Sequence, residues 1–158
     1  MLSIITKSAE ETFHLGKVLG QRLSPSCIVA LSGELGSGKT VLVKGIGKGI
    51  GISSLIKSPS FVTVHEYSGP IPLYHLDLYR VKNKQEIISS GYEEYLYRGK
   101  GIVTVEWADK MEDLLPEHHL RVNLEIVDLR TRRISFQPYG LLYERIVEEL
   151  NLATFRNR

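Results

Sequence analysis

Apolar residues are arranged in two ways along this chain. Some form short continuous runs, and others recur at helical spacing. Residues 27–32 form an apolar run and residues 102–105 form a β-branched apolar run, so both predict buried strands. Residues 41–50 carry apolar side chains at helical spacing, with Lys44 and Lys48 between them, which predicts an amphipathic helix. Strands and helices that alternate in this way predict an α/β fold.

The other predicted elements are short and are bounded by glycine, proline or capping residues. They are an edge strand or loose end at 1–5, a helix from a capping box at Ser8 to about residue 23, an antiparallel hairpin of 61–67 with 72–79, two short helices within 81–97 broken at Gly91, a helical turn at 111–115, a strand pair of 120–127 with 133–137, and a terminal helix at 139–152.

A glycine-rich motif lies between the first buried strand and the amphipathic helix. Residues 33–40 read Gly-Glu-Leu-Gly-Ser-Gly-Lys-Thr, the complete phosphate-binding P-loop pattern. Gly33, Gly36 and Gly38 lack a Cβ, so the chain can turn tightly and bring its N–H groups close to an anion. Lys39 is expected to reach the β- and γ-phosphates, and the Thr40 hydroxyl to bind Mg²⁺. A plain glycine-rich turn beside a surface lysine is the alternative, and the flanking strand and helix disfavour it.

The motif sharpens the predicted fold class. We expect an α/β fold with a P-loop NTPase-like mixed sheet, a parallel core with antiparallel strands, flanked by helices. The length of 158 residues suits a single P-loop domain over residues 1–158, with 151–158 as a tail that can fray.

A P-loop nucleotidase also needs an acidic residue at a strand end to hold Mg²⁺, and two residues qualify. Glu106 follows the buried run, and we favour it as the metal-side acid. Asp77 ends a more amphipathic strand and is expected near the γ-phosphate, where it either positions or deprotonates the attacking water or binds the ion through water. The two roles can also be exchanged. The alternative for each is a carboxylate that caps a turn or pairs with a base such as Arg80.

Composition narrows the function classes. The net charge of +2, from 20 basic and 18 acidic residues, is too small to indicate nucleic-acid binding. Cys27 is the single cysteine, which excludes an internal disulfide and fits a reducing compartment. No segment approaches the length of a membrane span, so we expect a cytoplasmic protein with no membrane partner. The five histidines lack zinc-ligand spacing, so a zinc site is not expected.

Three weaker signals remain. The loop at 57–60 falls where a γ-phosphate-sensing switch is expected, and Ser58 or Ser60 can donate to phosphate or metal there; an ordinary loop is the alternative. Trp107 either packs beside the nucleotide or, as is more common, lies in the core. The arginines at 130–133 form a basic turn that either contacts phosphate or RNA or is simply solvated.

Several motifs together resemble those of the TsaE (YjeE) family. The resemblance covers about residues 8 to 137 and rests on Glu10-Glu11-Thr12, the P-loop, Ser58-Pro59-Ser60-Phe61, His75-Leu76-Asp77-Leu78-Tyr79-Arg80 and Val105-Glu106-Trp107. The last two motifs, in this order and spacing, make the resemblance specific.

The resemblance implies a small ATPase that acts in threonylcarbamoyladenosine modification of tRNA. It implies ATP and Mg²⁺ as cofactors, with Thr40 and Glu106 at the metal and Asp77, Lys39 and Glu106 in catalysis. Family members act with TsaB and TsaD, so the same partners are implied here, with tRNA contacted only through that complex. The implied ATP-binding residues are Thr12, Gly33, Gly36, Ser37, Gly38, Lys39, Thr40 and Val41.

Two other functions use the same P-loop. A nucleoside or small-molecule kinase needs a lid with several arginines, and Arg80 and Arg98 are isolated in the sequence. A non-enzymatic nucleotide- or RNA-binding module is the second, and the modest charge argues against strong direct RNA affinity.

Overall fold

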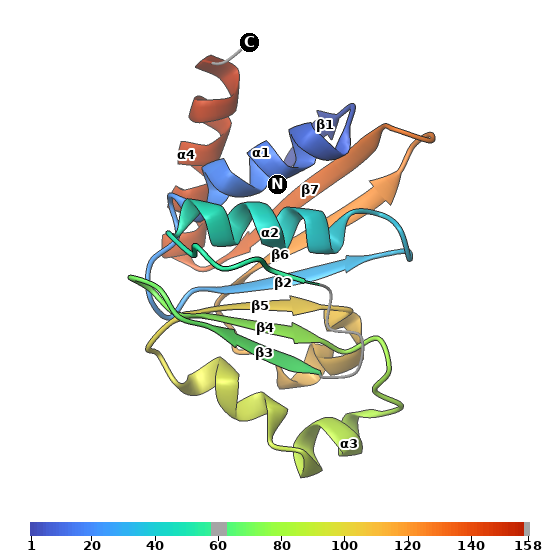
Figure 1. Ribbon diagram of the computed structural model, residues 1–158, viewed down its shortest axis with the longest axis vertical. Helices are drawn as coiled ribbons and strands as arrows, with labels where there is room; N and C mark the ends of the chain where they lie inside the picture. The colour runs from blue at the N-terminus through green and yellow to red at the C-terminus, as the bar shows by residue number, and fades with distance from the viewer. Residues whose placement is uncertain (58–62, 157–158) are drawn as a thin grey trace.

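The structure, a computed structural model, describes residues 1–57 and 63–156. Within these ranges seven strands form one sheet in the order β1-β7-β6-β2-β5-β4-β3 (Figure 1). The neighbours among β6, β2, β5 and β4 are parallel, whereas β1, β7 and β3 pair antiparallel with theirs. The predicted mixed α/β sheet with a parallel core is therefore confirmed. The strands are β1 (Leu2–Thr6), β2 (Ile28–Gly33), β3 (Val64–Tyr67), β4 (Leu73–Asp77), β5 (Ile102–Glu106), β6 (His119–Ile126) and β7 (Arg132–Tyr139).

Helices cover both faces of this sheet (Figure 1). On one face lie α1 (Ala9–Gly20), α2 (Lys39–Gly49) and α4 (Leu141–Arg156). On the other lie α3 (Lys84–Ser89) and the 3₁₀ helices η1 (Tyr92–Tyr97) and η2 (Ala108–Leu114). Because side chains alternate along a strand, Val29 and Leu31 enter the core under α1 and α2, and Ile28 and Ala30 enter the other.

The elements match the sequence pattern, and their boundaries shift by a few residues; the helical turn expected at 111–115, for example, is the 3₁₀ helix Ala108–Leu114. The edge-strand alternative for residues 1–5, both antiparallel pairs and the helix break at Gly91 are confirmed. The first helix ends at Gly20 instead of residue 23, since the N–H groups of Arg22 and Leu23 bond three residues back, to Leu19 and Gly20. The last helix begins at Leu141 and continues to Arg156, four residues past the expected end at 152.

Glycines let α1 and α2 pack backbone to backbone. A Cβ on Gly16 would lie 2.3 Å from the carbonyl oxygen of Leu42, and one on Gly45 would lie 2.1 Å from that of Phe13. Any larger residue would push the helices apart. The close contact brings the first turn of α1 beside the loop that precedes α2.

The carboxyl ends of the central parallel strands meet at one edge of the sheet. Leu31 of β2 pairs with Glu106 of β5, which in turn pairs with Asp77 of β4. Open α/β sheets bind their ligands outside this edge. The fold thus places the P-loop after β2 and both predicted carboxylates at one location.

Candidate functional site

The P-loop forms a tight bend that leads into the first turn of α2. The φ angles of Gly33, Gly36 and Gly38 are 149°, 80° and 102°, values that residues with a side chain rarely adopt. At Gly33 a Cβ would also lie 2.5 Å from the carbonyl oxygen of Leu124, on β6. Gly38 caps α2 without any side-chain hydrogen bond, so the first turn keeps N–H groups available to an anion.

The Lys39 side chain folds back over this bend. Its Nζ donates to the carbonyl oxygens of Gly33 at 2.7 Å and Glu34 at 2.9 Å. The residue is 4% exposed. Burial lowers the pKa of Lys39 below its ordinary value, and the carboxylates of Glu106 and Asp77 oppose that shift. An ammonium group held against the P-loop in this way is suited to bind phosphate oxygens.

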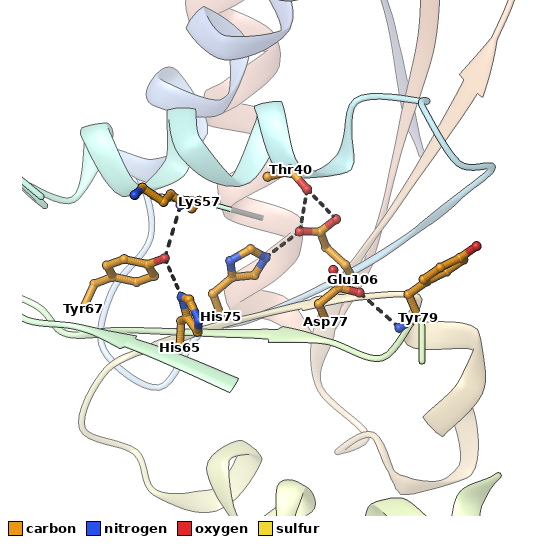
Figure 2. A network of polar contacts seen from close by, with 8 residues as sticks. All are labelled: Thr40, Lys57, His65, Tyr67, His75, Asp77, Tyr79 and Glu106. Atoms are coloured by element: carbon orange, nitrogen blue, oxygen red, sulfur yellow. Dashed lines mark hydrogen bonds and ion pairs between the residues drawn. The ribbon is translucent and has the colours of Figure 1, made fainter. Parts of the chain in front are cut away.

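Thr40, Glu106 and His75 form one hydrogen-bonded network between α2 and the strand ends (Figure 2). The Thr40 hydroxyl donates to both carboxylate oxygens of Glu106, at 2.9 and 3.0 Å. His75 Nε2 also lies 2.5 Å from Glu106 Oε2. Glu106 is buried and His75 is fully buried, so the carboxylate is fixed in one orientation.

Asp77 is held less firmly. It is partly buried, and its Oδ1 accepts a hydrogen bond of 3.0 Å from the backbone N–H of Tyr79 (Figure 2). Burial raises the pKa of Asp77, and the nearby charge of Glu106 raises it further, while the Tyr79 N–H acts in the opposite direction. The turn-capping contact considered for this residue is therefore present, beside the P-loop.

Trp107 lies against the Lys39 ammonium group, which is 4.2 Å from the indole ring centre. It is partly buried and packs on Tyr79, with 5.1 Å between ring centres. Its φ of 60° is unusual for a side-chain-bearing residue and directs the indole toward the site directly after Glu106. Trp107 is thus packed against the core on one side, in agreement with the core interpretation, and contacts Lys39 on the other. Its packing beside a nucleotide stays a prediction.

A cavity of about 380 Å³ also borders the P-loop, and its lining does not include Thr40, Asp77 or Glu106. Three segments enclose it: the start of α1, the P-loop with the first turn of α2, and the turn between β6 and β7. Thr12 is anchored there by a 2.7 Å hydrogen bond to Thr6. The lining residues are Ser8, Ala9, Thr12, Gly36, Ser37, Gly38, Val41, Leu129, Arg130 and Arg132.

Arg132 connects the β6–β7 turn to the P-loop. Its Nε donates to the carbonyl oxygen of Ser37 and its Nη2 to that of Gly36, both at 3.2 Å. Its Nη1 donates to carbonyl oxygens of its own turn, Asp128 at 2.8 Å and Thr131 at 3.0 Å. Arg132 thus contacts the P-loop through backbone carbonyl oxygens and uses none of its N–H groups. The basic turn is therefore a brace of the P-loop as well as a wall of the cavity.

Comparison with known proteins identifies the family. A family model described as Threonylcarbamoyl adenosine biosynthesis protein TsaE matches residues 6–134. The chain belongs to the TsaE family. The tRNA threonylcarbamoyladenosine biosynthesis protein TsaE of Bacillus subtilis is 37% identical over 147 residues, which are 92% of this chain and 91% of that protein. Its counterpart in Nostoc sp. is 40% identical over 145 residues, 89% and 88% of the two chains.

A solved structure agrees with this assignment. The crystal structure of Bacillus subtilis YdiB superposes with a TM-score of 0.83 at 34% identity, over 97% of this chain and 95% of that one. This TsaE family member therefore acts in tRNA threonylcarbamoyladenosine biosynthesis. Within the part of the chain that the structure describes, every helix is too short or too polar to cross a membrane.

The structure brings the predicted site residues of this TsaE family member into two adjoining groups. Lys39, Thr40, Glu106 and Asp77 gather at the strand ends, below the bend that starts at Gly33. The second group lines the cavity and contains Thr12, Gly36, Ser37, Gly38 and Val41. The switch expected at Ser58 and Ser60 lies outside the described residues.

Two residues with clear roles in this geometry had no such role in the sequence interpretation. His75 lies inside a resemblance motif, and its contact with Glu106 depends on the register of β4 against β5. Arg132 reaches the P-loop because β6 pairs with β2, where Leu124 lies opposite Gly33. A sequence signal for the β4–β5 and β6–β2 pairings would have been needed to predict the contacts of His75 and Arg132.

Proposed function

We propose that this protein binds ATP with Mg²⁺ and hydrolyses it as an accessory ATPase of tRNA threonylcarbamoyladenosine modification. One observation carries the proposal: Lys39 and the N–H groups of the P-loop lie beside the Thr40–Glu106 pair, at the carboxyl end of a parallel sheet. P-loop nucleotidases use this combination for a triphosphate and its magnesium.

The residues present fit a magnesium ion. Thr40 and Glu106 offer oxygen atoms only, which Mg²⁺ prefers, and it commonly binds one or two protein ligands together with water and phosphate. Thr40 and Glu106 would hold the ion, whose positive charge would offset the charge on the phosphate oxygens.

Lys39 and Asp77 take the remaining chemical roles in this proposal. Lys39 exchanges its contacts with the carbonyls of Gly33 and Glu34 for β- and γ-phosphate oxygens, where its charge stabilises the transition state. Asp77 lies beside Glu106 and retains a carboxylate oxygen to orient the attacking water or accept its proton. Its raised pKa brings it closer to the range in which a general base works well.

The cavity provides the place for the nucleoside. Its volume of about 380 Å³ falls within the ~300–1,000 Å³ usual for small-molecule pockets. Its walls continue directly from Gly36, Ser37 and Gly38, so a nucleoside in the cavity extends its phosphates along the P-loop. The Arg132 brace holds the wall and the phosphate loop in one relative position.

We propose TsaB and TsaD as partners, since the family acts in that modification pathway. Contact with tRNA is then made through the complex, because the net charge of +2 gives little attraction for a polyanion. The site of action in this proposal is the cytoplasm.

Calorimetry tests the binding step. The purified protein is titrated with non-hydrolysable ATP and Mg²⁺, beside Lys39→Ala and the control Lys48→Ala, an exposed lysine of the same helix. We expect binding by the wild type and by the control, and loss of at least tenfold in affinity for Lys39→Ala. Absence of binding by the wild type, or unchanged binding by Lys39→Ala, contradicts the proposal.

Phosphate release tests the catalytic step and separates the rival functions. We expect slow release by the protein alone and faster release with TsaB and TsaD. Release of ADP that depends strictly on an added nucleoside indicates a kinase instead. Binding of ATP without any hydrolysis, with or without the partners, indicates a non-enzymatic nucleotide-binding module.

A further inference from the structure

A buried histidine lies directly behind the carboxylate that the proposed function gives to the metal. We propose that His75 is a positioning residue, which holds Glu106 in the orientation that binds Mg²⁺. This inference rests on the proposed function and adds a residue to its metal site.

The geometry around Glu106 assigns the donor. A carboxylate only accepts hydrogen bonds, so the 2.5 Å contact requires the proton of the imidazole on Nε2. His75 contacts Oε2 alone, and Thr40 contacts both oxygens. Oε1 therefore keeps the larger share of free lone pairs, and the carboxylate cannot rotate without breaking one of these contacts.

The surroundings of His75 do not suggest a packing role. The side chain is fully buried on the α2 side of the sheet, on the same face of β4 as the core residue Leu73. Its Nδ1 has no partner among the described residues, and neither does the hydroxyl of Thr104, its register partner on β5. An apolar side chain would fill this position without unpaired polar atoms. Among the contacts described for it, the one to Glu106 is what an imidazole supplies and an apolar residue cannot.

The alternative is that Glu106 merely satisfies a structural histidine. The two roles differ in how a change at His75 affects metal affinity. A positioning residue changes metal affinity when its Nε2 donor is lost, and it leaves metal-free nucleotide binding unchanged, because the P-loop makes those contacts. A structural residue changes stability and leaves the metal affinity of the folded protein intact.

Two amide variants separate these roles. In His75→Gln the amide nitrogen can reach the place of Nε2, whereas in His75→Asn it reaches only the level of Nδ1. Both are neutral and polar, so they are matched in chemistry and differ in reach. Thr104→Val, which alters the same buried region without touching Glu106, is the control.

The measurement is Mn²⁺ affinity of the full chain with bound ADP, from the electron paramagnetic resonance of free Mn²⁺. Metal-free ADP affinity is measured in EDTA. We expect His75→Asn to weaken Mn²⁺ binding by about 10- to 100-fold, while ADP affinity in EDTA stays within about twofold. His75→Gln and Thr104→Val should keep Mn²⁺ affinity within about threefold of the wild type.

Equal Mn²⁺ affinities for His75→Asn and wild type, or equal losses in both amide variants, overturn the inference. Loss of ADP binding in EDTA also overturns it, since the effect then does not act through the metal. If His75→Asn does not fold, the apolar His75→Met, of similar volume, replaces it with the same expectation. Failure of the wild type itself to bind Mn²⁺ with ADP refutes the proposed function, which is thereby distinguished from failure of the variants.

Discussion

Glu106 and Asp77 end neighbouring parallel strands and face each other in the sheet register, yet their surroundings differ. Glu106 is buried and receives hydrogen bonds from both Thr40 and His75. Asp77 is partly buried and accepts one bond, from the backbone of Tyr79. One carboxylate is fixed in advance, and the other retains freedom and accessible lone pairs.

This difference favours distinct tasks for two residues of the same chemistry. A metal ligand benefits from a fixed orientation, because its side chain has then lost its conformational freedom before the ion binds. A residue that orients or deprotonates water needs an open oxygen and a pKa nearer neutrality, and burial raises the pKa of Asp77. Sequence reasoning favoured this division while leaving the exchange of roles open. The division itself stays a prediction, and the two carboxylates differ in burial and hydrogen bonding in the way that it requires.

Removing the charge of Glu106 should produce the largest effect. We expect Glu106→Gln to lower ATP hydrolysis by about 10³-fold and to abolish its dependence on Mg²⁺, since the amide no longer offers an anionic ligand. The measurement is phosphate release against Mg²⁺ concentration at saturating ATP. Should Glu106→Gln keep the Mg²⁺ dependence of the wild type while Asp77→Asn loses it, the two roles are exchanged.

Asp77→Asn should have the next largest effect, on turnover alone. We expect kcat to fall by about 10²-fold and KM for ATP to change by less than about threefold, because the P-loop makes the ground-state phosphate contacts. The amide oxygen still accepts the Tyr79 N–H, so the turn should be preserved. Steady-state kinetics decide the matter, and a large rise in KM with unchanged kcat would show that Asp77 serves binding instead.

The sequence predicted the elements better than their pairing. The P-loop, both strand-end acids and the antiparallel hairpins follow from local signals, since glycine spacing, apolar runs and turn residues act over a few positions. The registers that pair Asp77 with Glu106 and Gly33 with Leu124 join residues far apart in the chain. Packing across the whole sheet sets those registers, so no local pattern encodes them.

The difference between local and long-range signals also explains why the role of Arg132 was missed. Arg132 belongs to a charged turn, and such turns are usually only solvated, but it contacts Ser37, 95 residues away. Close packing of α1 on α2 likewise depends on Gly16 and Gly45, whose spacing suggests nothing until the helices are seen together. The sequence located the residues of the proposed phosphate site, and three-dimensional contacts reveal what holds them in place.

A smaller effect concerns pH. If Asp77 acts as a carboxylate, hydrolysis should fall about tenfold per pH unit on the acid side, with a midpoint above the ordinary aspartate value because burial raises its pKa. Asp77→Asn should lack this limb of the profile. The measurement is kcat against pH at saturating Mg²⁺ and ATP, with circular dichroism to verify that the protein stays folded. An acid limb that persists unchanged in Asp77→Asn assigns the titration to another group.

The smallest expected effect is on stability, where Asp77→Asn should raise the melting temperature by about 1–3 °C at neutral pH. The fold raises the pKa of Asp77, so above that pKa burial disfavours the charged native state relative to the unfolded chain. Below the pKa of the unfolded chain both states are protonated, and the gain should vanish. Asp113 is the matched control, because its hydrogen bond from Lys84 lowers its pKa. Asp113→Asn should therefore give no gain at neutral pH. Calorimetric melting at neutral and acid pH tests both signs, and a gain in Asp77→Asn that persists in acid would mean that its charge is not the cause.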